Sequence, residues 1–211
     1  MRRLLVLAAC LAAIGGARAD TIIDDWAKVQ TPPPPEVKPV AVDPKTDALL
    51  LLDFNGFDAA TSGPCNKALR PRCLASLPKV KAALDAARAH HVLVVYSETP
   101  KTKPLDIWPD VAPLGGDPIV RSGPDKFIGT DLRTLLESKG IKRIIVTGTA
   151  AEGAVLYTAS DAALHGMSVV IPVDGMSSST LYAEQYVAWN MTHAPWIGQK
   201  TALTTLEGLK F

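Results

Sequence analysis

Short apolar runs alternate along the chain with segments whose apolar residues recur at helical spacing. The runs lie at residues 48–54, 92–96, 119–121, 143–147, 168–173 and 201–206. They are nearly continuous in apolar residues, which is typical of strands that are buried on both faces of a parallel sheet. The segments between them predict helices near residues 77–87, 132–136, 153–165 and 180–193. The pattern therefore predicts an α/β fold, a Rossmann-like three-layer α/β/α sandwich with a mainly parallel sheet of about six strands.

The first 46 residues have a different character. A positive start at Met1 is followed by an apolar stretch at 4–14, too short to span a bilayer, and by small residues up to Ala19. We interpret 1–19 as a secretory signal peptide. The alternative is a lipoprotein box at Cys10, although only six apolar residues precede that cysteine. Residues 20–46 form a proline-rich, extended arm, and 47–211 form the folded domain.

Composition limits the partners of the mature protein. The chain has 211 residues, of which 47% are hydrophobic and 20% charged, which suits one globular domain. Removal of residues 1–19 takes away three arginines and no acidic residue, so the net charge changes from +1 to −2. This charge gives no support for binding to nucleic acid or to an anionic membrane. We expect a protein secreted into the bacterial periplasm, with no stable membrane span after signal cleavage.

Two cysteines remain in the mature chain, Cys65 and Cys73, within a segment rich in turn-forming residues. An even number of cysteines in an exported protein favours a disulfide between them. The alternative is that Cys65 is a reactive thiol, but no histidine lies near it in the sequence. We therefore predict a Cys65–Cys73 disulfide.

Four segments match, in order, the motifs of a known family. They lie at residues 48–55, 127–132, 146–150 and 169–177. Through them the chain resembles the isochorismatase-like hydrolases, also called the cysteine hydrolase family, over residues 48–206. Members include nicotinamidases, N-carbamoyl amide hydrolases and isochorismatases proper. The resemblance implies a hydrolase of a small molecule, and by analogy a homo-oligomer.

The resemblance also points to three catalytic positions. In the amidases of this family, an aspartate ends the first strand, a lysine ends the third, and a cysteine begins the helix after the fourth. These positions fall on Asp53, Arg121 and Ala154. The cysteine acts as a thiolate nucleophile that is favoured by the positive end of the helix. Because a methyl group cannot attack a carbonyl, the resemblance implies a degenerate active site without covalent thiol catalysis.

The first hypothesis is a secreted hydrolase that works on a small molecule without a covalent cysteine intermediate. Isochorismatases proper also lack the cysteine and use the aspartate to protonate a vinyl ether. Asp53 would then act as the acid or base, and the guanidinium of Arg121 would hold an anionic substrate as an electrostatic clamp.

The alternative is a catalytically inactive periplasmic protein that binds a small molecule or has a structural role. In that case Asp53 and Arg121 would form a buried ion pair, since losing one partner leaves a charge buried. A third hypothesis assigns the role of base to Glu152, although an acid at a helix N-terminus also complements the helix dipole. We expect Lys126 to be a solvated loop lysine.

The resemblance also suggests which residues line the pocket. The expected substrate-binding residues are Asn55, Phe57, Trp108, Ala150 and Ala154. In the family, the peptide bond that corresponds to Thr149–Ala150 is often cis, but the sequence leaves this open. Metal-binding nicotinamidases carry an acid-and-histidine cluster after the first strand, and residues 55–62 contain no histidine. We therefore expect no metal and no cofactor.

Overall fold

The computed structural model describes residues 20–58 and 63–211, in two compact units that divide after Pro33. The expected signal peptide and Cys10 lie outside the described residues. In the first unit, a short 3-10 helix spans Trp26–Lys28. The second unit holds the sheet and its helices, and it includes residues 34–46 of the expected arm.

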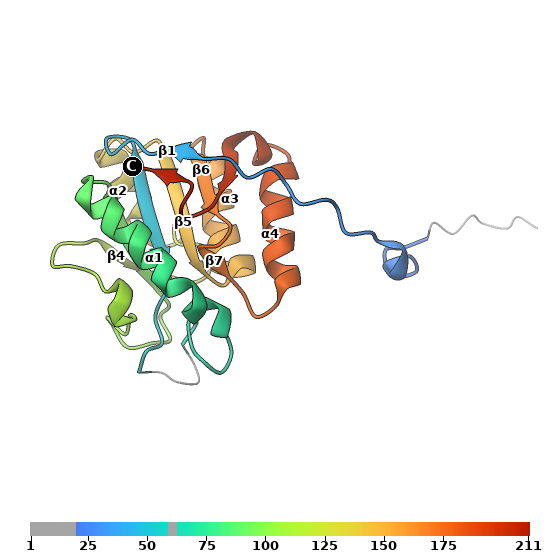
Figure 1. Ribbon diagram of the computed structural model, residues 1–211, viewed down its shortest axis with the longest axis horizontal. Helices are drawn as coiled ribbons and strands as arrows, with labels where there is room; N and C mark the ends of the chain where they lie inside the picture. Colours follow the sequence, from blue (N-terminus) through green and yellow to red (C-terminus); the bar gives the residue numbers. More distant parts are fainter. Residues whose placement is uncertain (1–19, 59–62) are drawn as a thin grey trace, which may run out of the picture. The chain divides into compact units, whose positions relative to one another are not determined.

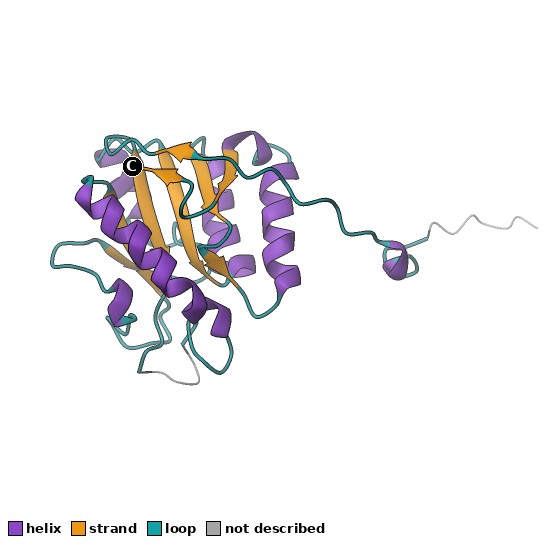
Figure 2. Ribbon diagram, in the orientation of Figure 1, coloured by secondary structure: helices purple, strands orange, loops and turns teal. Residues whose placement is uncertain are grey.

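A seven-stranded parallel sheet forms the centre of the second unit (Figures 1 and 2). Six strands follow the order β4-β3-β2-β5-β6-β8, and β7 pairs with the carboxyl end of β5. The predicted three-layer α/β fold is confirmed, with β7 as an additional strand. The strands are β2 (Asp47–Leu52), β3 (Leu93–Glu98), β4 (Ile119–Arg121), β5 (Arg143–Thr149), β6 (Ser168–Pro172), β7 (Met176–Ser177) and β8 (Thr201–Thr204).

Helices cover both faces of this sheet. They are α1 (Pro71–Ala89), α2 (Leu132–Ser138), α3 (Leu156–Leu164) and α4 (Leu181–His193). Helix α1 packs on one face, where it shares a core with Leu49 and Leu51 of β2. Helices α2, α3 and α4 pack on the other face, together with Leu50 and Leu52. Successive strand residues thus point to opposite cores, which explains why each strand is apolar throughout.

A two-stranded parallel sheet joins β1 (Val40–Ala41) to β9 (Leu209–Lys210), near the end of the chain. The apolar pattern did not predict either strand. Val42, which follows β1, is buried in the core on the α1 side. The last residues before the domain are therefore packed against its C-terminal segment.

The predicted disulfide is confirmed, with an S–S distance of 2.02 Å between Cys65 and Cys73. It joins the segment after β2 to the first turn of α1, and both cysteines are fully buried. Among the residues that the structure describes, no helix is both long enough and apolar enough to cross a bilayer.

Candidate functional site

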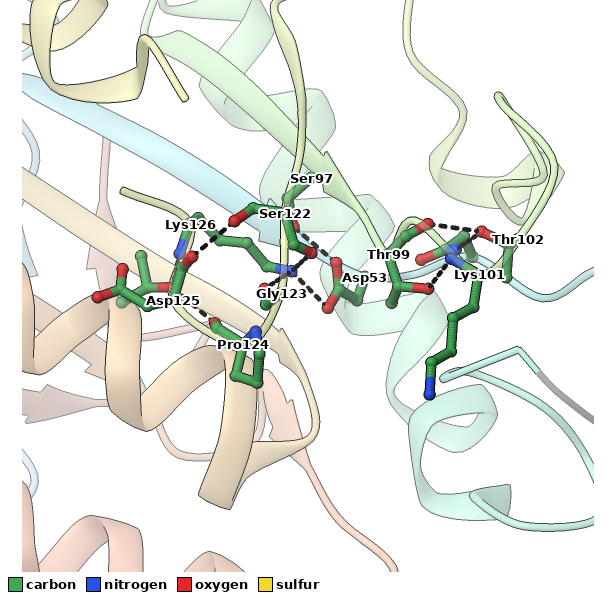
Figure 3. A network of polar contacts seen from close by, with 12 residues as sticks. Asp53, Ser97, Thr99, Lys101, Thr102, Ser122, Gly123, Pro124, Asp125 and Lys126 are labelled. Atoms are coloured by element: carbon green, nitrogen blue, oxygen red, sulfur yellow. Dashed lines mark hydrogen bonds and ion pairs between the residues drawn. The ribbon is translucent and has the colours of Figure 1, made fainter. Parts of the chain in front are cut away.

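Asp53 lies immediately after β2, at the carboxyl edge of the sheet, where ligands bind in open α/β folds. Its backbone has a φ of 57°, in the left-handed region that residues other than glycine seldom adopt. The Asp53 amide donates a hydrogen bond to the Ser97 carbonyl at 3.1 Å. The Ser97 hydroxyl in turn donates to Asp53 Oδ1 at 2.8 Å. These bonds hold the carboxylate in one orientation (Figure 3).

Lys126 supplies the positive charge beside this carboxylate. Its Nζ donates to Asp53 Oδ2 at 2.8 Å, and also to the carbonyls of Gly123 at 2.8 Å and Ser122 at 3.3 Å. The expectation of a solvated lysine is wrong, because Lys126 is fully buried. Three acceptors occupy the three N–H groups of an ammonium, so Lys126 is a charged donor and has no free lone pair for attack.

The loop of residues 122–126 is shaped by polar contacts that hold Lys126 in place. The Ser122 hydroxyl lies 2.9 Å from the Asp125 carbonyl and 2.7 Å from that of Ile128. The Lys126 amide donates to the hydroxyl of Thr158 on α3 at 3.2 Å. Figure 3 shows the loop folding around the lysine amine, which points toward Asp53.

Arg121 is paired with Glu98 and Asp53 with Lys126, so the Asp53–Arg121 ion pair expected under the alternative hypothesis is wrong. Strand periodicity gives the reason. Val120 packs in the core on the α2 side, so the next residue of β4 points to the α1 side. There the guanidinium pairs with the buried carboxylate of Glu98, its register partner on β3, and donates to the Thr102 carbonyl at 2.8 Å.

Burial raises the pKa of the Asp53 carboxyl above its ordinary value. The Lys126 ammonium and the hydrogen bond from Ser97 oppose this effect but are outweighed by desolvation. A carboxyl group with a raised pKa keeps its proton at a higher pH than an exposed aspartate. Asp53 is therefore suited to donate a proton, and its conjugate base is stabilised by an adjacent cation.

Ala154 lies in a π-helical turn, Ala151–Val155, that leads directly into α3. The turn follows a cis peptide bond between Thr149 and Ala150, a point that the sequence had left open. Ala154 is buried in the core on the α2 side of the sheet, the side on which Lys126 also contacts α3. In the described part of the chain both cysteines form the disulfide, so no free thiol is present there.

Glu152 belongs to a separate polar network. Its Oε2 accepts a hydrogen bond from the Ser178 hydroxyl at 2.5 Å, and the Ser178 amide donates to Glu184 Oε1 at 2.9 Å. Glu184 also receives two hydrogen bonds from Arg72 of α1. The network connects the π-helical turn with α4 and α1. Among the described residues, Glu152 therefore shares no hydrogen-bond partner with Asp53 or Lys126.

Three of the expected pocket residues gather on the segments that follow β2 and β3. Asn55 is buried, forms a β-bridge with Ile107 and donates from its amide to the Thr102 hydroxyl. The rings of Phe57 and Trp108 meet edge to face, with centroids 5.0 Å apart. The Trp108 indole donates to the Cys65 carbonyl at 2.7 Å. The disulfide therefore lies next to this aromatic wall.

Sequence reasoning missed Lys126 and Ser97. Lys126 directly precedes Phe127, the first residue of one matching segment, and this position was the only signal in the sequence. Ser97 lies in a continuous strand and carried no signal at all. Both contacts arise from tertiary structure, since Ser97 and Asp53 are 44 residues apart and Lys126 and Asp53 are 73 apart.

Fold and site together define an α/β protein with a buried acid–amine pair at the carboxyl edge of a parallel sheet. The chain belongs to the isochorismatase family, because the model of the isochorismatase domain matches residues 47–202.

Curated relatives include the secreted isochorismatase effector Isc1 of Verticillium dahliae. It is 30% identical over 113 residues, which cover 48% of this chain and 60% of that protein. The uncharacterized isochorismatase family protein YaaI of Bacillus subtilis is 32% identical over 87 residues, covering 41% of this chain and 48% of that protein. The chain thus spans about half to three fifths of the length of these relatives.

Solved structures share the fold at low sequence identity. An isochorismatase family protein from Desulfovibrio vulgaris has a TM-score of 0.67 at 18% identity, over 77% of this chain and 95% of that one. The nicotinamidase SaPncA from Staphylococcus aureus has a TM-score of 0.66 at 16% identity, over 76% of this chain and 99% of that one. At these identities the similarity establishes the fold alone.

Proposed function

We propose that the protein is a secreted hydrolase that acts on a small molecule without a covalent cysteine intermediate. The observation that carries the proposal is the buried Asp53–Lys126 pair, in a chain that has Ala154 where the sequence predicted the nucleophile position. Covalent catalysis would require a thiol where Ala154 stands, whereas acid catalysis requires only a carboxyl group that can hold a proton. The raised pKa of Asp53 supports the second of these.

In the proposed reaction, protonated Asp53 transfers its proton to the substrate at the bond that is to be broken. Water adds to the resulting electrophilic carbon, the bond to the leaving group breaks, and the proton that the water releases returns to Asp53. The Lys126 ammonium and the Ser97 hydroxyl stabilise the transient carboxylate. Arg121, which the sequence suggested as a clamp for an anionic substrate, is instead paired with Glu98, and Lys126 has the different role of stabilising the Asp53 carboxylate.

Secretion is part of the proposal. The residues before Asp20 have the pattern of a signal peptide. The disulfide suits an oxidising compartment, and one relative is named as a secreted effector. We place the protein in the bacterial periplasm. The test is fractionation of cells that express the full chain. Recovery of the protein in the reducing cytosol would contradict the proposed secretion.

The test is hydrolysis by purified residues 20–211 of a panel of amides, carbamoyl compounds, esters and vinyl ethers. Asp53→Asn removes the transferable proton while keeping nearly the same shape. Lys79→Met serves as the matched control, because Lys79 is also paired with an aspartate, Asp174, but at the exposed surface. We expect turnover that Asp53→Asn abolishes and Lys79→Met leaves intact. Turnover that survives Asp53→Asn would disprove the assigned role.

The second candidate function is binding without turnover. The observation that favours it is the methyl group of Ala154 at the position of the family nucleophile. A compound from the panel that raises the Tm of the protein without being consumed would support this function. Consumption of that compound by clean protein would exclude it.

A further inference from the structure

Two buried threonines on β5 have contrasting environments. Thr147 and Thr149 are two residues apart, so both side chains leave the same face of the sheet, the one covered by α1, where Ile145 also packs. Both are almost completely buried. The Thr147 hydroxyl donates to the Leu50 carbonyl at 2.9 Å. The Thr149 hydroxyl has no hydrogen-bond partner within residues 20–58 and 63–211.

Ser177 repeats this situation on the neighbouring strand. It is the register partner of Thr149, so the two side chains leave the same face on strands about 4.8 Å apart. Ser177 is 2% exposed, and its hydroxyl also lacks a partner in the described chain. Strand β7 lies beside β5 only at Gly148 and Thr149, the last two residues before the cis peptide. The two residues that carry these hydroxyls thus lie side by side at the carboxyl edge of the sheet.

A buried hydroxyl without a partner is unfavourable, because it has lost its hydrogen bonds to water and gained none in return. Folded proteins contain few such groups, and each requires an explanation. At the edge of the sheet where ligands bind, a buried polar group without a partner is expected if a ligand supplies its hydrogen-bond partner. Two adjacent cases on in-register strands are difficult to attribute to packing alone, since alanine or valine would fill the same space.

We propose that Thr149 and Ser177 form a ligand subsite that binds the planar carboxyl or carboxamide group of the small molecule. Each hydroxyl donates one hydrogen bond to an sp² oxygen, and the adjacent strands set the spacing of the two donors. The subsite rests on the proposed function in one respect, namely that the small molecule binds at this edge of the sheet. It requires no turnover.

The first measurement is the Tm of ligand-free Thr149→Val, Ser177→Ala and Thr147→Val. Thr147→Val is the matched control, because it removes a hydroxyl from the same face of the same strand, but one that has a partner. We expect Thr149→Val and Ser177→Ala to raise the Tm by about 2–6 °C and Thr147→Val to lower it. If the first two also lower the Tm, the hydroxyls serve the fold, for example through a trapped water, and the subsite is refuted.

The second measurement identifies the bound group. Sodium acetate and acetamide are the smallest carboxylate and carboxamide probes, and sodium chloride controls for ionic strength. We expect at least one probe to raise the Tm of the wild-type protein more than that of the Thr149→Val, Ser177→Ala double variant. Equal shifts in the two proteins, zero included, would overturn the assigned ligand class. Because Asp53→Asn is judged by turnover and this variant by heat stability, failure of one proposal leaves the other testable.

Discussion

Lys126→Met is the sharpest test of the buried ion pair. The substitution keeps the length of the side chain but removes the ammonium, whose Nζ lies 2.8 Å from Asp53 Oδ2 with no exposure to solvent. The Asp53 carboxylate would keep only the hydrogen bond from Ser97. Removing one partner of a buried pair costs about 3–5 kcal/mol. For a domain of this size, the Tm should fall by about 6–20 °C at neutral pH.

The loss should depend on pH, and the pKa of Asp53 gives the direction. Burial already raises this pKa, and without Lys126 one opposing effect disappears, so the pKa rises further. The folded-state pKa of this carboxyl exceeds its unfolded-state pKa of 3.8. Such a group contributes its full stabilisation when the pH is below 3.8, and this contribution is lost as the pH rises through the folded-state pKa. Lys126→Met should therefore be less destabilised at pH 5 than at pH 8.

The assay is thermal unfolding of residues 20–211 at both pH values, with a second substitution to complete the cycle. Asp53→Asn cannot become charged, so adding it to Lys126→Met should recover part of the stability at pH 8 and flatten the pH dependence. Lys79→Met removes an exposed pair with Asp174 and should lower the Tm far less than Lys126→Met does. A Lys126→Met variant no less stable than Lys79→Met would refute the reasoning.

Two further predictions concern the candidate site. Ala154→Cys should create the one free thiol within residues 20–211. Its pKa should lie below the ordinary value of about 8.5, because the residue stands in the first turn of the helical segment that continues into α3. The measurement is the rate of alkylation by iodoacetamide as a function of pH, and a rate that declines below about pH 8.5 as it does for an ordinary thiol would contradict this prediction. Ser97→Ala should raise the pKa of Asp53 further, since it removes a hydrogen bond that favours the charged form, and should shift the pH profile of turnover to higher pH; an unshifted profile would count against a positioning role for Ser97.

The sequence predicted the large elements well because their cause is local. Six consecutive buried residues in β2 and the apolar run in β5 reflect burial on both faces of the sheet, which a single sequence displays directly. Strands β1, β7 and β9 contain two residues each, too few to show any periodicity. These short strands form because tertiary folding brings their partner strands alongside them. The local sequence pattern therefore cannot predict them.

The candidate site was predicted only in part, and the error has one physical origin. The family spacing placed the cation at position 121, but the periodicity of β4 sends Arg121 to the α1 side, where Glu98 neutralises it. The chain then turns through Ser122 and Gly123 and returns with Lys126 on the other side of the sheet. Which side a loop residue reaches depends on contacts such as that with Thr158, which spacing along the chain does not show.

The relocated cation changes how the missing nucleophile is to be interpreted. With Lys126 in place, the candidate site has both an acid and a positive charge, and Ala154 stands where the sequence predicted the nucleophile position. A buried ion pair is often no better for stability than apolar residues of similar size, and the left-handed backbone at Asp53 adds a cost of its own. Loss of either partner alone would leave a buried charge, so a structural role also explains why the pair is kept, but it does not explain the strained backbone at Asp53. Their presence together favours a reaction that uses the proton of Asp53 over a purely structural role for the pair.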